Sequence, residues 1–178
     1  TMGESRKVYG VINGIEGLIK GNKVLLESRI TPPLDHLAAL PGAFLGAGRY
    51  PLTRTALSDV IERLFHDNIQ KLVLCGGNGT MWACEQIKKA SIEAGKELQV
   101  IGIPKTVDND LLLTDHSPGF ASAARYVSMA IQNIGIDLAA MRNFETVRVL
   151  ETMGRNVGWL AAASSLWKHS QEDPSHLV

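Results

Sequence analysis

The stretch that decides the fold is Gln99-Val100-Ile101-Gly102-Ile103-Pro104-Lys105-Thr106-Val107-Asp108-Asn109-Asp110. It begins as a short apolar run and turns, after a proline, into a loop with two aspartates one residue apart. An apolar run without polar alternation is typical of a strand covered on both faces, as in a parallel sheet. In an extended loop, residues i and i+2 point the same way, so we expect the two carboxylates to face one ligand.

Two further loops of this kind follow β-rich segments. Gly76-Gly77-Asn78-Gly79-Thr80 follows residues 71–75, and Met153-Gly154-Arg155 follows residues 146–151. Shorter β-rich segments occur at 7–12 and 23–26, and apolar residues at helical spacing occur at 57–65, 81–95, 120–138 and 157–167. Strands that alternate with helices predict an α/β fold, with an open, doubly wound, mainly parallel sheet and helices on both faces. Ligands of such sheets bind beyond the carboxyl ends of the strands, where all three loops fall.

Composition narrows the class of protein. The 178 residues fit one domain, 1–178, and 18 basic residues balance 18 acidic ones, which argues against nucleic acid or a membrane surface as a partner. No apolar run approaches the roughly 18 residues that span a bilayer, and no signal peptide is visible, so we expect a cytoplasmic protein. The two cysteines and five histidines have no metal-ligand spacing.

The glycine-rich loop turns from a strand into a helix. Backbone N–H groups there can approach an anion, and the helix N-terminus favours negative charge. The alternative is a tight turn that needs glycine for its backbone conformation alone. The helix near 120 is expected to begin with Ser117 as N-cap and Pro118 at its first position.

Asp108 and Asp110 carry the stronger signal. One carboxylate could take a proton from a substrate hydroxyl while the other holds a magnesium ion. The alternative is a cluster of Asp and Asn that only stabilises a turn. Lys105 and Thr106 favour the functional interpretation because they add phosphate donors to the same loop. Arg49 and Arg155 each follow a glycine and could contact a phosphate, although either alone would more often be a solvated arginine.

Together these loops resemble the 6-phosphofructokinase family, whose motifs GGDG[ST], P[GK]T[IV]DND and E-x-MGR follow one another in the same order. The resemblance implies the N-terminal lobe of such an enzyme, which transfers a phosphoryl group from ATP or pyrophosphate to the 1-hydroxyl of fructose 6-phosphate in glycolysis. It also implies Mg²⁺ as cofactor and a homo-oligomer for the full-length protein.

The resemblance assigns roles by motif position. Asp108 would be the base that takes the hydroxyl proton, and Thr106 would contact the transferring phosphoryl group or the sugar. Asp110 would bind magnesium. The sugar phosphate and the developing charge would be held by Met153, Gly154 and Arg155. The phosphoryl donor would be held by Arg49, Gly77, Asn78, Gly79, Thr80 and Lys105, with Asn78 also at the metal.

The chain departs from the family pattern in three ways. Asn78 stands where the family usually has an aspartate, which weakens the expected metal site. Gly79 resembles ATP-using members, whereas Lys105 and residues 114–120 resemble pyrophosphate-using or long-form members, so both donors stay open with ATP slightly favoured. The first strand and the second lobe of the family have no counterpart, so we expect an incomplete phosphofructokinase that is inactive alone.

Two other functions fit parts of this pattern. A non-catalytic sugar-phosphate-binding or regulatory remnant of a phosphofructokinase would account for Asn78 and the missing lobe. An NAD-kinase-like enzyme would share the glycine-rich loop, but it would lack the later KTxDND and MGR motifs.

Overall fold

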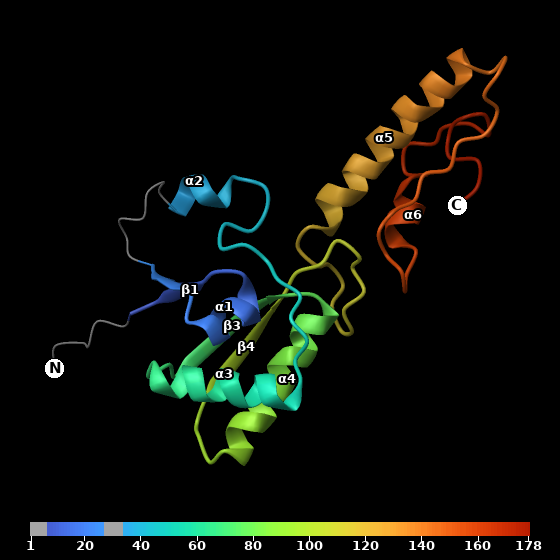
Figure 1. Ribbon diagram of the computed structural model, residues 1–178. Coiled ribbons are helices and arrows are strands. Elements are labelled where there is room, and N and C mark those ends of the chain that lie inside the picture. Colours follow the sequence, from blue (N-terminus) through green and yellow to red (C-terminus); the bar gives the residue numbers. More distant parts are fainter. Residues whose placement is uncertain (1–6, 27–33) are drawn as a thin grey trace. The chain divides into compact units, whose positions relative to one another are not determined.

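The computed structural model describes residues 7–26 and 34–178 (Figure 1). The chain divides into two compact units. The first comprises Thr1–Leu72 and Ala83–Val100, and the second comprises Val73–Trp82 and Ile101–Val178. The single domain expected for residues 1–178 stays a prediction.

Helices and strands follow one another along most of the described chain. They are β1 (Tyr9–Val11), α1 (Gly14–Lys20), β2 (Lys23–Leu25), α2 (Leu34–Ala38), α3 (Arg54–His66), β3 (Lys71–Gly76), α4 (Asn78–Glu93), β4 (Gln99–Pro104), α5 (Phe120–Ala140) and α6 (Trp159–Ala163). The predicted α/β class is confirmed. Within the described residues, no helix is long and apolar enough to cross a membrane.

In the first unit, β1 pairs antiparallel with β2, with Gly10 opposite Val24. Helix α1 connects the two strands and packs against α3. The apolar stripe of α3 is buried as predicted, with Val60 and Leu64 almost inaccessible to solvent. The Lys23 ammonium lies 2.5 Å from the Asp67 carboxylate and, as the main cause, holds the pKa of Asp67 below its ordinary value. This pair links β2 to the end of α3.

Strands β3 and β4 form a second sheet. Gln99 N–H donates to Gln70 O at 2.9 Å, and Lys105 N–H donates to Gly76 O at the same distance. From the first bond to the second, the residue numbers of donor and acceptor increase by the same amount. The two strands therefore run parallel. Their burial on both faces was predicted, but Val73 and Ile101 are about half exposed. Each strand has only the other as a neighbour within the described residues.

In the second unit, α5 packs against α6 (Figure 1). Their cluster contains Ala124, Leu160 and Ala163, and Val107 from the β4–α5 loop packs against it. Ser128 Oγ lies 2.6 Å from Ala163 O and 2.9 Å from Ala124 O, fully buried. A serine inside this apolar contact therefore joins the two helices through a backbone carbonyl.

Three local predictions need correction. Residues 146–151 form no strand; instead Arg148 bonds Asp137 of α5 at 2.7 Å and also pairs with Glu145. The final helix is shorter than 157–167, because the chain continues from Ala163 in turns. Ser117 is not the N-cap of α5. Gly119 occupies that position with φ 99°, and it forms a parallel bridge with Thr106.

Candidate functional site

The glycine-rich turn joins β3 to α4. A Cβ placed on Gly76 would lie 2.1 Å from Thr80 Oγ1, so only glycine leaves room for that side chain. Thr80 N–H and Met81 N–H both donate to Gly77 O, which starts the helix directly after the turn. The N–H groups of Asn78 and Gly79, which precede these two, have no acceptor within the helix, so this end is suited to an anion.

The loop between β4 and α5 lies against this turn. Gly77 packs on Thr106, since a Cβ on Gly77 would be 3.5 Å from Thr106 Cβ. Asn78 Nδ2 donates to Asp110 O at 3.3 Å. Thr106, Asp110 and the turn at 76–80 therefore belong to one neighbourhood of the second unit, as the sequence predicted for two of the three loops.

The sequence predicted an extended loop at this position, and that prediction is wrong. Asn109 has φ 53°, a left-handed conformation, so Asp108 and Asp110 do not alternate along a strand-like segment. Asp108 N–H donates to Thr106 Oγ1 at 3.2 Å, which is a turn within the motif. The turn interpretation and the functional one are thus compatible, because side chains of the motif build the turn that carries Asp108.

Asp108 has one carboxylate oxygen in an unusual position. Its Oδ1 is buried, and no group of the described residues hydrogen-bonds to it. A buried carboxylate oxygen without a partner is costly, so this oxygen is available to accept a hydrogen bond from a bound group. Asp108, Asp110 and Asn78 supply oxygens, the donor type that Mg²⁺ prefers. These donor types match the expected cation, although no group of three or more His, Cys, Asp or Glu side chains within the described residues could hold a metal ion.

The third predicted loop, Met153-Gly154-Arg155, makes fewer contacts with the site. Met153 and Arg155 are exposed, and Gly154 adopts φ 117°. Within the described residues, no hydrogen bond or ion pair joins Arg155 to Asp108 or to the glycine-rich turn. Helix α6 begins four positions further on, and its Leu160 shares a cluster with Val107. The structure therefore brings the helix after the MGR motif to the loop, but it shows no contact of the arginine itself.

Two donor-binding candidates lie outside the contacts just described. Lys105 has an exposed side chain, while its backbone N–H completes the strand pair with Gly76. Arg49 belongs to the first unit, in a glycine-rich loop that lies against Asn13: Asn13 N–H donates to Leu45 O at 2.8 Å. Gly79 is open, since a Cβ placed on it would meet no atom within 4 Å.

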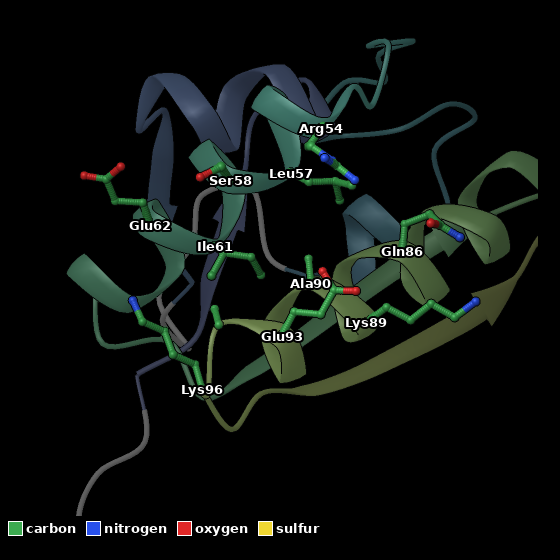
Figure 2. Close-up of a pocket in the computed structure, with 11 residues that line it drawn as sticks. Arg54, Leu57, Ser58, Ile61, Glu62, Gln86, Lys89, Ala90, Glu93 and Lys96 are labelled. Atoms are coloured by element: carbon green, nitrogen blue, oxygen red, sulfur yellow. The ribbon is translucent and has the colours of Figure 1, made fainter.

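A cavity of about 610 Å³ opens within the first unit, between α3 and α4 (Figure 2). Figure 2 shows Arg54, Ser58 and Glu62 of α3 along it, opposite Gln86, Lys89 and Glu93 of α4. No predicted site residue lines it. Its lining carries charges of both signs, and Lys89 also pairs with Glu85, which lies outside the lining. The cavity is therefore separate from the candidate site.

Sequence reasoning missed two residues of the β4–α5 loop. Asn109 bonds both Asp115 and Ser117, and Ser117 is completely buried. The available signal was the residue type at 109, because asparagine tolerates the left-handed region better than most residues. Nothing in the pattern around Ser117 separates a buried serine from a helix cap.

Comparisons with known proteins fit this arrangement. A family model described as phosphofructokinase matches residues 1–172. The chain belongs to the phosphofructokinase family. A sulfofructose kinase of Alkalicoccus urumqiensis is 46% identical over 94% of this chain and 44% of its own length. A pyrophosphate–fructose 6-phosphate 1-phosphotransferase of Halomonas elongata is 36% identical over 97% of this chain and 42% of its own length.

A solved structure gives the same result for the fold. The pyrophosphate-dependent phosphofructokinase of Marinobacter aquaeolei matches with a TM-score of 0.79 and 33% identity, over 97% of this chain and 43% of that one. The chain thus spans less than half the length of these phosphofructokinase relatives.

Proposed function

We propose that this chain forms part of a phosphotransferase that moves a phosphoryl group from ATP or pyrophosphate to the 1-hydroxyl of fructose 6-phosphate. The observation that carries the proposal is the contact between the glycine-rich turn and the Asp108 loop, through Gly77 with Thr106 and Asn78 with Asp110. A phosphate-binding turn and a carboxylate with an unsatisfied buried oxygen then share one site. Phosphoryl transfer needs little else beyond positioning and charge stabilisation.

In this proposal each motif residue acts on a stated group. Asp108 accepts the proton of the sugar hydroxyl, a role that its Oδ1 suits because that oxygen has no other partner in the described residues. Thr106 orients Asp108 through the backbone bond and contacts the phosphoryl group or sugar. Met153, Gly154 and Arg155 hold the acceptor's anionic end, and Arg155 offers a bidentate contact.

The donor side would be formed by Gly77, Asn78, Gly79, Thr80 and Lys105, and Arg49 of the first unit stays a donor-binding prediction from its motif position. Asp110 and Asn78 would hold Mg²⁺, which neutralises charge on the phosphates when it is bound. Because an amide holds a cation less strongly than a carboxylate, Asn78→Asp should reduce the magnesium concentration needed for half-maximal rate. An unchanged magnesium requirement would remove Asn78 from the metal site.

The choice of donor depends on the open space at Gly79. An aspartate is accommodated there, because no atom lies within 4 Å of the added Cβ and the residue is helical. Gly79→Asp should therefore fold normally, but its carboxylate would obstruct a nucleotide. We expect the variant to lose turnover with ATP and to keep turnover with pyrophosphate. Equal loss with both donors would argue that Gly79 serves the turn alone.

A second candidate acceptor is sulfofructose, which the 46% identity to a sulfofructose kinase favours. A sulfonate carries one charge, whereas a phosphate monoester carries about 1.5–2 at pH 7 with a second pKa near 6. The whole gene product should be assayed with both sugars across pH 5.5 to about 8. If kcat/KM is higher for sulfofructose at every pH, sulfofructose and not fructose 6-phosphate is the acceptor.

Two further measurements on the same gene product, calorimetry and an assay with NAD, test the remaining alternatives. A non-catalytic remnant would bind one of these sugars in calorimetry and turn over neither. An NAD-kinase-like enzyme would phosphorylate NAD instead. A cytoplasmic location and a homo-oligomeric full-length protein remain predictions beside the proposed activity.

A further inference from the structure

Asn109 uses both ends of its side-chain amide to close the β4–α5 loop. Its Oδ1 accepts from Ser117 N–H at 2.7 Å, and its Nδ2 donates to Asp115 O at 3.1 Å. A backbone carbonyl can only accept and a backbone N–H can only donate, so the reverse orientation of the amide would lose both bonds. One side chain therefore ties the end of the loop back to its beginning.

The two closing bonds differ in their contact with water: the bond to Ser117 is partly buried, whereas the bond to Asp115 is exposed. Ser117 is completely buried and Leu111, inside the closed segment, is 7% exposed. A hydrogen bond screened from water is electrostatically stronger than one in solvent, and this applies to the bond with Ser117 but not to the one with Asp115. Just beyond the closure, Thr106 and Gly119 form their parallel bridge. The segment from Thr106 to Gly119 is thus held at both ends and across its middle.

Asp108 lies directly between these bonds. On one side its own N–H donates to Thr106 Oγ1, and on the other side the chain turns at Asn109 with φ 53°. We propose that Asn109 is a positioning residue whose amide fixes the direction of the Asp108 carboxylate. The inference rests on the proposed function, in which that carboxylate takes the proton of the acceptor hydroxyl.

A simpler explanation of Asn109 is its backbone conformation alone, since asparagine and glycine both enter the left-handed region. The two explanations predict different activities for the variant Asn109→Gly. Glycine keeps the conformation but removes both amide bonds. If only the backbone mattered, the glycine variant would work as well as the original protein.

The chain supplies a matched control. Asn68 has φ 54°, almost the same as Asn109, and it lies in the turn between α3 and β3 of the first unit. Within the described residues, its side chain makes no hydrogen bond. Asn68→Gly therefore repeats the same chemical change at the same backbone conformation, at a residue that belongs to no part of the candidate site.

The experiment compares Asn109→Gly, Asn68→Gly and the unchanged sequence in the whole gene product, with thermal melting to show that each is folded. A carboxylate displaced by about 1 Å costs on the order of 10²-fold in rate. We expect kcat to fall by about that factor in Asn109→Gly, with KM for the acceptor within about twofold. Asn68→Gly should keep both constants. An unchanged kcat in a folded Asn109→Gly protein would overturn the proposal.

A second measurement does not depend on turnover. The ¹³C chemical shift of the Asp108 carboxyl, assigned by its loss in Asp108→Asn, should move in Asn109→Gly and stay in place in Asn68→Gly. If the unchanged protein phosphorylates neither sugar, the proposed function fails but this shift still decides the role of Asn109. An unmoved Asp108 signal would show that the amide does not position the carboxylate.

Discussion

The segment after β4 and the segment at 146–155 carry motifs of the same family, but they are held in different ways. Residues 106–119 are fixed by bonds from Thr106 and Asn109 and by the Thr106–Gly119 bridge. Residues 146–155 form no strand, and Val149 is 86% exposed. Their described anchor is the pair of ion contacts from Arg148.

The difference shows what places a motif in space. In the first segment, polar side chains of the motif bond to the backbone around it, so the loop carries its own supports. In the second, the apolar residues would need a neighbouring strand to be buried, and the described residues offer none. Hydrogen bonds encoded within a segment are therefore realised locally, whereas strand formation depends on a partner.

The largest effect should come from the self-supporting segment. Asp108→Asn keeps the size and turn of the loop but removes the proposed base, so kcat should fall by about 10²–10⁴-fold while KM for the acceptor changes little. Steady-state kinetics with fructose 6-phosphate and calorimetry of its binding measure the two effects separately. Unchanged kcat would exclude Asp108 as the base.

A smaller effect is expected in the exposed segment. Arg155→Lys keeps the charge but would lose the proposed bidentate contact, so KM for the acceptor should rise about tenfold to a hundredfold. The matched control is Arg142→Lys, at an exposed arginine in the turn that follows α5. Equal results for both variants would mean that Arg155 is simply a solvated arginine.

The same contrast explains which features the sequence could predict. Strands β3 and β4 agree with prediction to within a residue, because each is a short apolar run that ends in a glycine or proline turn. The long apolar stripe of α5 is equally clear, since it continues over many turns of one helix. The prediction of a strand at 146–151 is wrong. An apolar run indicates that burial would be favourable, but it does not show that a neighbouring strand is present.

The candidate site was predictable in part. The meeting of the glycine-rich turn with the Asp108 loop follows from parallel strands that end at one edge. The left-handed turn at Asn109 does not, since the same residues also fit an extended loop. The start of α5 was misplaced for a related reason: Ser117 N–H is bound by Asn109, and Gly119 begins the helix. Contacts several positions apart decided both features.

A third variant tests the link between the helices that follow the two segments. Ser128→Ala on α5 removes the buried bond to Ala163 O of α6, and that carbonyl then keeps only Leu166 N–H as a described donor. Unfolding free energy should fall by about 0.5–1.5 kcal/mol, measured by urea denaturation. Ser165→Ala is the control, because Ser165 Oγ bonds Ala162 O at an exposed position, and it should change stability by less than about 0.5 kcal/mol. Equal losses would show that burial of the serine is unimportant.

The smallest effect should come from the anchor of the exposed segment. The pKa of Arg148 is raised by its hydrogen bond to Asp137 and then by Glu145, so the guanidinium stays charged at every accessible pH. Solvent and salt screen such an exposed pair, and Arg148→Met should lower the melting temperature only slightly at low salt. At about 1 M salt, where the Debye length is about 3 Å, the difference from the unchanged protein should vanish. A large loss that persists at high salt would mean that Arg148 holds the segment by packing, and that residues 146–155 are supported more like the Asp108 loop than their exposure indicates.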